Sequence, residues 1–245
     1  MKSVQNTYSS LWCKLQNVLN TQNIPREILE EMAANLAHGI RNPLAGIANF
    51  VSLLSDEVAP TQSPRISKIK EGVQHIELIL ENLITFSKPI HPYYIKCNFI
   101  DIIHAAVDSL KKTLNNDQVR CCYHFSDEEV YAEVDPELIK QALRCVVQNA
   151  IEAMPVGGEV AVSLFKRTKA NKLIVTVRDQ GIGLKDADIN KLFYPFYTTK
   201  ANGMGLGLAL SKMYLEKHSG EISLKRNANK GVTVELELPL GARGN

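Results

Sequence analysis

The stretch Asp179-Gln180-Gly181-Ile182-Gly183, followed downstream by Gly203-Met204-Gly205-Leu206-Gly207, is the most informative feature of this chain. The first turn sets a carboxylate, which only accepts hydrogen bonds, among glycines that let the backbone approach a flat ligand closely. The second turn opens a helix, where main-chain N–H groups form a site for anions. The sequence contains no GxxxxGK[ST] motif, which excludes a P-loop. Together the turns predict a nucleotide site of another kind.

The composition excludes several classes of function. The 245 residues are 45% hydrophobic, enough for one or two domains with buried cores. The formal net charge of +2 indicates no nucleic-acid or membrane-surface partner. The sequence shows neither an apolar run of about 18 residues nor a signal-peptide pattern, which predicts a cytoplasmic chain without a membrane segment. The five cysteines lack metal-ligand spacing and are expected to be free thiols.

The first third of the chain carries two heptad patterns. A long helix is expected from Pro25 to about Glu57, and a second from Ile66 to Leu83. A hairpin of two helices is too thin to bury both apolar seams, so a second copy is expected to complete a four-helix bundle. The chain is therefore predicted to be a homodimer. The seams consist of Ala33, Ala37, Ile40, Leu44, Ile47, Val51 and Leu54, and of Ile66, Ile69, Val73, Ile76, Leu80 and Leu83.

After a linker at residues 89–92, helix and strand signals alternate. The order predicts an α+β sandwich with helices on one side of a mixed sheet. The expected helices are near 100–115, 136–153, 186–192 and 206–218, and the expected strands near 118–125, 130–134, 159–167, 172–178, 221–226 and 231–238. The predicted organisation is an N-terminal lead-in segment at 1–23, the helical domain at 24–92 and the α+β domain at 93–245.

A histidine on the first helix is a candidate nucleophile. Helical spacing puts His38, Arg41 and Asn42 on one face, beside the apolar seam. A neutral imidazole has a free lone pair near pH 7. Pro43 removes the hydrogen bond to the carbonyl of Gly39 and loosens the helix just after His38. A lone surface histidine usually has no such role, so the hypothesis depends on the motifs that accompany it.

Several motifs, in order, resemble those of the two-component sensor histidine kinases over residues 24–240. The matching segments are His38–Leu44 for the H-box, Asn149–Pro155 for the N-box, Asp179–Gly183 for the first glycine box, Lys191–Lys200 for the F-box and Gly203–Leu208 for the second glycine box. Gly231-Val232-Thr233 resembles the strand whose threonine completes the adenine pocket. The resemblance implies a dimerisation and histidine-phosphotransfer domain followed by a Bergerat (GHKL)-type ATP-binding domain.

The resemblance also implies roles for single residues. Asp179 would accept the exocyclic amine of adenine, which favours ATP over GTP, and Asn149 would be the Mg²⁺ ligand. His38 would receive the γ-phosphoryl group and pass it to an aspartate on a response-regulator receiver domain. The segment from about 185 to 204 would close over the triphosphate as a lid. The other implied ATP-binding positions are Gly181, Gly183, Lys200, Gly203, Gly205, Leu206, Gly207 and Thr233.

Gly39 is the main departure from the family pattern, which usually has Glu or Asp after the histidine. Glycine cannot accept a proton, and general-base help is typically worth about 10²–10⁴-fold. Autophosphorylation is therefore expected to persist but to be slow. Two further departures are Cys145, where the N-box often has asparagine, and Glu152, where some members carry lysine.

Two alternative functions follow from these departures. Asn42 matches the position that aligns water against the regulator's acyl-phosphate, so the chain could act mainly as a phosphatase or phosphotransfer scaffold with weak kinase activity. Another ATPase of the same fold, of the gyrase or heat-shock chaperone type, would clamp by dimerisation, but the H-box and heptad hairpin argue against it. Residues 1–23 are too few for an ordinary folded sensor, so input is expected from a separate protein or from a portion outside this sequence.

Overall fold

The computed structural model describes residues 90–114, 118–184, 189–195, 197–200 and 205–240, together with Ile40, residues 44–52 and single positions between 66 and 85. The chain divides into two compact units, Met1–Pro89 and Ile90–Asn245. Within the described ranges, no helix has the length and apolarity needed to cross a membrane. None of the described cysteines, which are Cys97, Cys121, Cys122 and Cys145, forms a disulfide, as expected.

The described positions of the N-terminal unit are helical wherever the sequence predicts the two helices of the hairpin. Ile40 and residues 44–52 belong to the first of these helices, and Val73 and Ile76 are helical positions of the second. The lead-in segment and the residues His38, Gly39 and Asn42 lie outside the described residues.

Burial divides the heptad seam into two halves. Leu44, Val51 and Val73 are only 5–7% exposed, whereas Ile47 and Ile69 are about half exposed. Within one copy, therefore, the described seam positions alternate between a buried and an exposed set, as expected when a pair of helices covers only one side of each seam.

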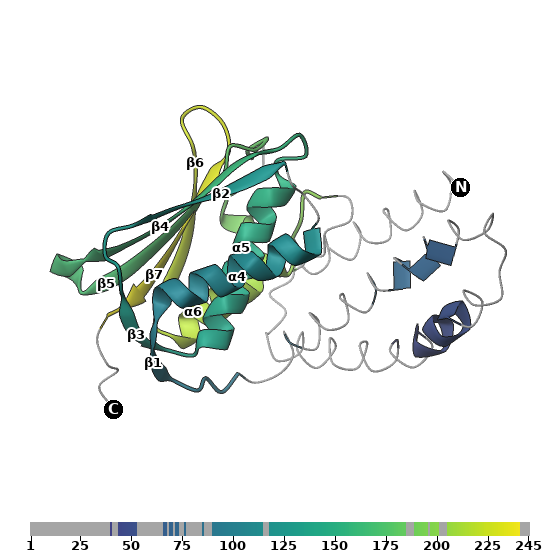
Figure 1. Cartoon of the computed structure of the whole chain (residues 1–245), viewed down its shortest axis with the longest axis horizontal. Helices are drawn as coiled ribbons and strands as arrows, with labels where there is room; N and C mark the ends of the chain where they lie inside the picture. The colour runs from purple at the N-terminus through teal and green to yellow at the C-terminus, as the bar shows by residue number, and fades with distance from the viewer. Residues whose placement is uncertain are drawn as a thin grey trace. The chain divides into compact units, whose positions relative to one another are not determined.

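The C-terminal unit is an α+β sandwich in which, among its described residues, helices cover one face of a five-stranded sheet (Figure 1). Its elements are β1 (Ile95–Asn98), α4 (Phe99–Leu114), β2 (Val119–Phe125), β3 (Tyr131–Val134), α5 (Pro136–Glu152), β4 (Gly158–Arg167), β5 (Lys172–Arg178), α6 (Gly207–Lys217), β6 (Glu221–Arg226) and β7 (Val232–Pro239), with 3₁₀ turns η1 (Thr168–Ala170) and η2 (Ile189–Phe193). The strand order is β2-β4-β5-β7-β6. Because β2 runs parallel to β4 and the other pairs are antiparallel, the sheet is mixed, which confirms the predicted class.

The core lies between the sheet and the layer formed by α4, α5 and α6. Every second residue of β7 is buried, from Val232 and Val234 to Leu236 and Leu238, as the period-two pattern predicts. Helix α5 contributes its apolar face, with Ile139, Ala142, Leu143, Val146, Val147, Ala150 and Ile151 buried. Each buried large aliphatic side chain contributes roughly 1.5–3 kcal/mol. This burial fixes α5 on the sheet and leaves its polar edge available to the site.

Strand β1 and the turn η2 differ from the sequence expectation. Strand β1 was not predicted, because four residues that include Lys96 and Asn98 are too short and polar to show a period. It pairs antiparallel with β3 in a separate two-stranded sheet, with Ile95 opposite Val134. The helix expected at 186–192 is, over its described residues, the 3₁₀ turn η2 at Ile189–Phe193.

Candidate functional site

Helix α5 carries the N-box residues to one end of the helical layer. It begins at Asp135, whose Oδ1 accepts hydrogen bonds from the main-chain N–H groups of Glu137 and Leu138, both at 3.1 Å. Pro136 occupies the first helical position, where its missing N–H has no cost. Since the apolar face of α5 is buried, Asn149 is left half-buried on the polar edge. A well-capped helix thus presents the predicted Mg²⁺ ligand at a defined place.

The second glycine turn meets α5 at this same place. Gly205 adopts a φ of 69°, a left-handed conformation that glycine takes at little cost, and Leu206 is buried at 1% exposure. A Cβ added to Gly207 would lie 3.9 Å from Nδ2 of Asn149. The first main-chain N–H groups of α6 therefore lie beside Asn149, where a helix N-terminus favours an anion. Gly203, also predicted for this turn, lies outside the described residues.

Asp179 follows β5 and is buried, with 5% exposure. Its main-chain N–H donates to the carbonyl of Val232 at 2.9 Å, and its Oδ1 accepts from the N–H of Gly181 at 2.8 Å. Burial raises the pKa of Asp179, and the hydrogen bond from Gly181 opposes this rise only in part. The site therefore holds a buried carboxylate that is suited to accept a hydrogen bond from a ligand.

Glycines bring the backbone around Asp179 into close contact. A Cβ on Gly181 would lie 2.5 Å from the carbonyl oxygen of Ala153, so no side chain fits there. Gly231 has a φ of 83°, and a Cβ on it would collide with the carbonyl oxygen of Asp179. The N–H of Ile182 donates to the carbonyl of Ala153 at 3.0 Å. The first glycine turn is thus pressed against the end of α5, and Gly183, with a φ of 69°, completes it.

Thr233 connects to Asp179 through Asn227, a residue that none of the sequence motifs includes. Its hydroxyl donates to Oδ1 of Asn227 at 2.6 Å, and Nδ2 of Asn227 donates to the carbonyl of Asp179 at 2.9 Å. Asn227 lies in the turn between β6 and β7. In the sequence it is one more polar turn residue, and only the pairing of β6 with β7 shows that it faces Asp179.

Lys200 contacts the N-box. Its Nζ donates to Oδ1 of Asn149 at 2.7 Å and to Oε2 of Glu152 at 2.5 Å. The ammonium thus contacts two hard oxygens, a donor set that would suit Mg²⁺, an ion that takes one or two protein oxygens and completes its shell with water and phosphate. Across the described ranges, no group of three or more His, Cys, Asp or Glu residues could hold a metal alone. A divalent cation at Asn149 would thus need the phosphates of a nucleotide.

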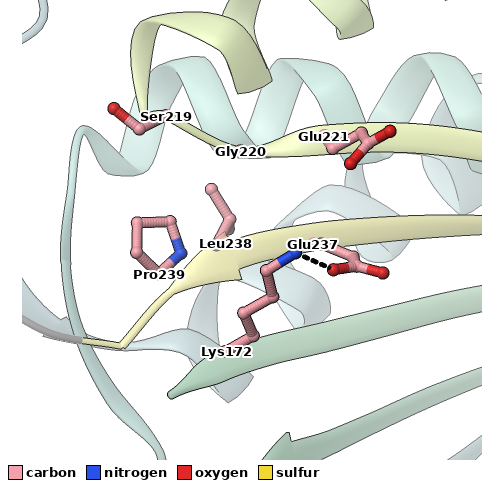
Figure 2. Close-up of a pocket in the computed structure, with 7 residues that line it drawn as sticks. All are labelled: Lys172, Ser219, Gly220, Glu221, Glu237, Leu238 and Pro239. Atoms are coloured by element: carbon pink, nitrogen blue, oxygen red, sulfur yellow. Dashed lines mark hydrogen bonds and ion pairs between the residues drawn. The ribbon is translucent and has the colours of Figure 1, made fainter. Parts of the chain in front are cut away.

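A pocket lies where β5 and β6 begin and β7 ends (Figure 2). It is lined by Lys172, Ser219, Gly220, Glu221, Glu237, Leu238 and Pro239. Lys172 pairs with Glu237 at 2.5 Å across β5 and β7, and this contact holds the pKa of the Glu237 carboxyl below its usual value. The pocket contains none of the predicted site residues.

Two family models match the chain. The His Kinase A (phospho-acceptor) domain matches residues 28–92, which include His38, Gly39 and Asn42. The histidine kinase-, DNA gyrase B- and HSP90-like ATPase matches residues 134–242, which include Asn149, Asp179 and both glycine turns. Each model thus covers one of the two parts to which the sequence assigns a role.

Sporulation kinase E of Bacillus subtilis (strain 168) is 30% identical over 213 residues, which make up 87% of this chain and 29% of that protein. This chain thus spans under a third of that relative. Histidine kinase ThkA, solved in complex with response regulator protein TrrA, is 27% identical with a TM-score of 0.66, covering 87% of this chain and 62% of that one. Full-length ShkA in complex with AMPPNP shares the fold at 18% identity, with a TM-score of 0.73 over 88% of this chain and 47% of that one. The chain belongs to the two-component histidine kinases and carries their catalytic core, a phospho-acceptor domain followed by a histidine kinase-type ATPase domain.

Proposed function

We propose that this chain binds Mg·ATP in its C-terminal unit, transfers the γ-phosphoryl group to His38 and passes it to an aspartate of a response-regulator receiver domain. The observation that carries this proposal is the meeting of a buried Asp179, the N-terminus of α6 and Asn149 within one unit. The family supports the same assignment, and the ThkA–TrrA complex supports a response regulator as the partner.

The adenine end of the site is assigned to Asp179. An ionised carboxylate accepts the exocyclic amine of adenine, whereas guanine presents a carbonyl at that position and would repel it. The hydrogen bonds from Asn227 to the carbonyl of Asp179 and from Thr233 to Asn227 hold the backbone of Asp179 in place, and the N–H of Gly181 orients its carboxylate. Gly181 and Gly183 let the turn lie close to a flat base. Selectivity for ATP over GTP follows.

The phosphate end is assigned to the turn that runs from Gly203 through Gly205 and Leu206 to Gly207. The first N–H groups of α6 would donate to phosphate oxygens, and Lys200 would add positive charge. Asn149 would hold Mg²⁺ through its amide oxygen, and the bound ion supplies neutralisation of the charge on the triphosphate. Positioning of the reactants and neutralisation of charge thus account for most of the expected rate of phosphoryl transfer.

His38 is the proposed nucleophile. One imidazole nitrogen attacks the γ-phosphorus, the bond to the bridging oxygen breaks, and ADP leaves with that oxygen. Gly39 offers no carboxylate to orient or deprotonate the imidazole, so this step is slow. Asn42 would align water against the acyl-phosphate of the regulator, which makes phosphatase activity the second proposed function. A scaffold with weak kinase activity is the alternative if the first step fails.

We further propose that the N-terminal unit is a homodimer. Ile40, Ile47, Phe50, Ile69 and Ile76 are 38–71% exposed although they are large and apolar. Four of them are seam positions, and a second hairpin would cover them. The proposed domains are 1–23 as a lead-in, 24–92 for dimerisation and phosphotransfer, and 93–245 for ATP binding, with input from a separate protein or an additional segment.

Phosphotransfer tests this function directly. The chain is first incubated with Mg²⁺ and γ-labelled ATP and then mixed with a panel of receiver domains. Label is expected to leave the chain and appear on one receiver, and not on its variant with the acceptor aspartate changed to asparagine. Excess unlabelled GTP should leave the labelling unchanged. ATP hydrolysis without any labelled protein would contradict the proposal.

A further inference from the structure

Lys200 contacts the amide oxygen of Asn149, which the proposed function assigns to Mg²⁺. The ammonium lies 2.7 Å from Oδ1 of Asn149, within hydrogen-bond distance. Because two cations on one amide oxygen repel each other, the ammonium has to leave this oxygen when the metal binds.

Glu152 holds the ammonium in this position. It lies one helical turn after Asn149 on α5, and its Oε2 accepts from Nζ of Lys200 at 2.5 Å. Its other oxygen, Oε1, accepts from Nε2 of Gln148 at 2.8 Å, four residues earlier on the same helix. The carboxylate is therefore oriented by its own helix, with one oxygen left to face the lysine.

The strength of this contact limits the size of its effect. The side chains of Lys200 and Glu152 are 40% and 38% exposed, and exposed ion pairs are weak because water screens them. Such a pair cannot lock the site, but it can shift a competition between two cations by a small factor.

We propose that Glu152 is a positioning residue that holds the Lys200 ammonium on Asn149, so that Mg²⁺ has to displace a resident cation before it can bind with the nucleotide. The proposal rests on the proposed function, since it takes Asn149 as the Mg²⁺ ligand. It assigns to Glu152 a role in setting the Mg²⁺ requirement for nucleotide binding.

The first test needs neither metal nor nucleotide. Lysines of the full chain are acetylated briefly with an activated ester, and the label on each is measured by mass spectrometry. In Glu152→Gln the reactivity of Lys200 should rise about two- to fivefold, the range that exposed ion pairs produce. The matched control is Glu216→Gln, which removes a carboxylate 3.9 Å from Lys212 on α6 and should leave Lys200 unchanged. Equal Lys200 reactivity in the wild type and Glu152→Gln would overturn the proposal.

The second test is a double-mutant cycle on the Mg²⁺ concentration that gives half-maximal binding of AMPPNP. The loss of the Glu152 charge alters this midpoint through space. If Glu152 acts only in this way, Glu152→Gln changes the midpoint by the same factor whether residue 200 is Lys or Met. The proposal predicts a difference instead. In the Lys200→Met background, Glu152→Gln should raise the Mg²⁺ midpoint by some factor. In the background that keeps Lys200, the factor by which Glu152→Gln changes the midpoint should be about two- to fivefold smaller.

The outcomes separate this inference from the proposed function. Equal effects of Glu152→Gln in both backgrounds, with AMPPNP still bound, would overturn the inference alone. Absence of AMPPNP binding by the wild-type chain at every Mg²⁺ concentration would overturn the proposed function and the inference with it. Circular dichroism of each variant is used to check that Glu152→Gln and Lys200→Met leave the fold intact.

Discussion

The main-chain N–H of Gly181 donates to Oδ1 of Asp179 at 2.8 Å, and this contact fixes the direction of a buried carboxylate. The same glycine is pressed against the carbonyl of Ala153 at the end of α5, so the helix that carries Asn149 also supports the turn that carries Asp179. The proposed adenine and metal ends of the site are thus joined through a few backbone contacts rather than through a long loop.

Asp179→Asn should lower the affinity for ATP without lowering the stability of the fold. The asparagine oxygen would take the hydrogen bond from Gly181 and leave its NH₂ group facing the adenine amine, so two donors would oppose each other. ATP affinity should fall about tenfold or more, because an unmet buried hydrogen bond costs about 1–3 kcal/mol. Titration calorimetry measures this loss. Thermal unfolding should show equal or greater stability at neutral pH, since a buried charge is removed, and unchanged ATP affinity would contradict the assignment.

The affinity for ATP should depend on the charge of Asp179. Burial raises its pKa above the ordinary 3.8, so the folded state favours the protonated form. Ionisation of Asp179 therefore lowers the stability of the folded state. This cost is absent below the pKa of the unfolded state and is complete once the pH has risen through the pKa of the folded state. Adenine binding needs the ionised carboxylate. As the pH is lowered, ATP affinity should therefore begin to fall before the pH reaches the ordinary aspartate pKa of 3.8. The ratio of wild-type to Asp179→Asn affinity removes the titration of ATP itself, and a ratio that stays constant would contradict this role.

Gly231→Ala should destabilise the C-terminal unit. The new Cβ would collide with the carbonyl oxygen of Asp179, at a φ that alanine rarely adopts. The expected loss is about 1–3 kcal/mol, measured by urea unfolding of the full chain. Gly72→Ala is the matched control, because Gly72 is helical and its added Cβ meets nothing within 4 Å. That variant should gain about 0.5–1 kcal/mol. Similar losses in both variants would show that the contact is not the cause.

Gly39→Glu should raise the rate of autophosphorylation. A carboxylate next to His38 can orient the imidazole and accept its proton, an effect worth about 10²–10⁴-fold in general. An increase of about tenfold or more is expected in the initial rate of labelling. Gly46→Glu makes the same change on the predicted helix at an exposed position and should leave the rate unchanged. If both variants label at the wild-type rate, slow transfer does not come from Gly39.

The sequence predicted the elements whose burial pattern repeats over many residues, and also the short strand β3, but it missed β1. Helix α5 and strand β7 were predicted because their burial patterns run over many residues. Strand β1 has only four residues, and its pairing with β3 depends on contacts distant in sequence. Asn227 was missed for the same reason, since its role depends on where the β6–β7 turn folds. The motifs indicated that Lys200 belongs to the site, but only the structure shows that it contacts Asn149 and Glu152.

The most direct test of phosphoryl transfer to His38 is incubation of the chain with Mg²⁺ and γ-labelled ATP beside a His38→Ala control. The wild-type protein is expected to carry label that is lost in acid, survives alkali and is absent from the control, because a phosphoryl group on imidazole is acid-labile. Absence of label on the wild type, with ATP binding shown by calorimetry, would contradict transfer to His38. That result would leave the phosphatase or scaffold function as the alternative.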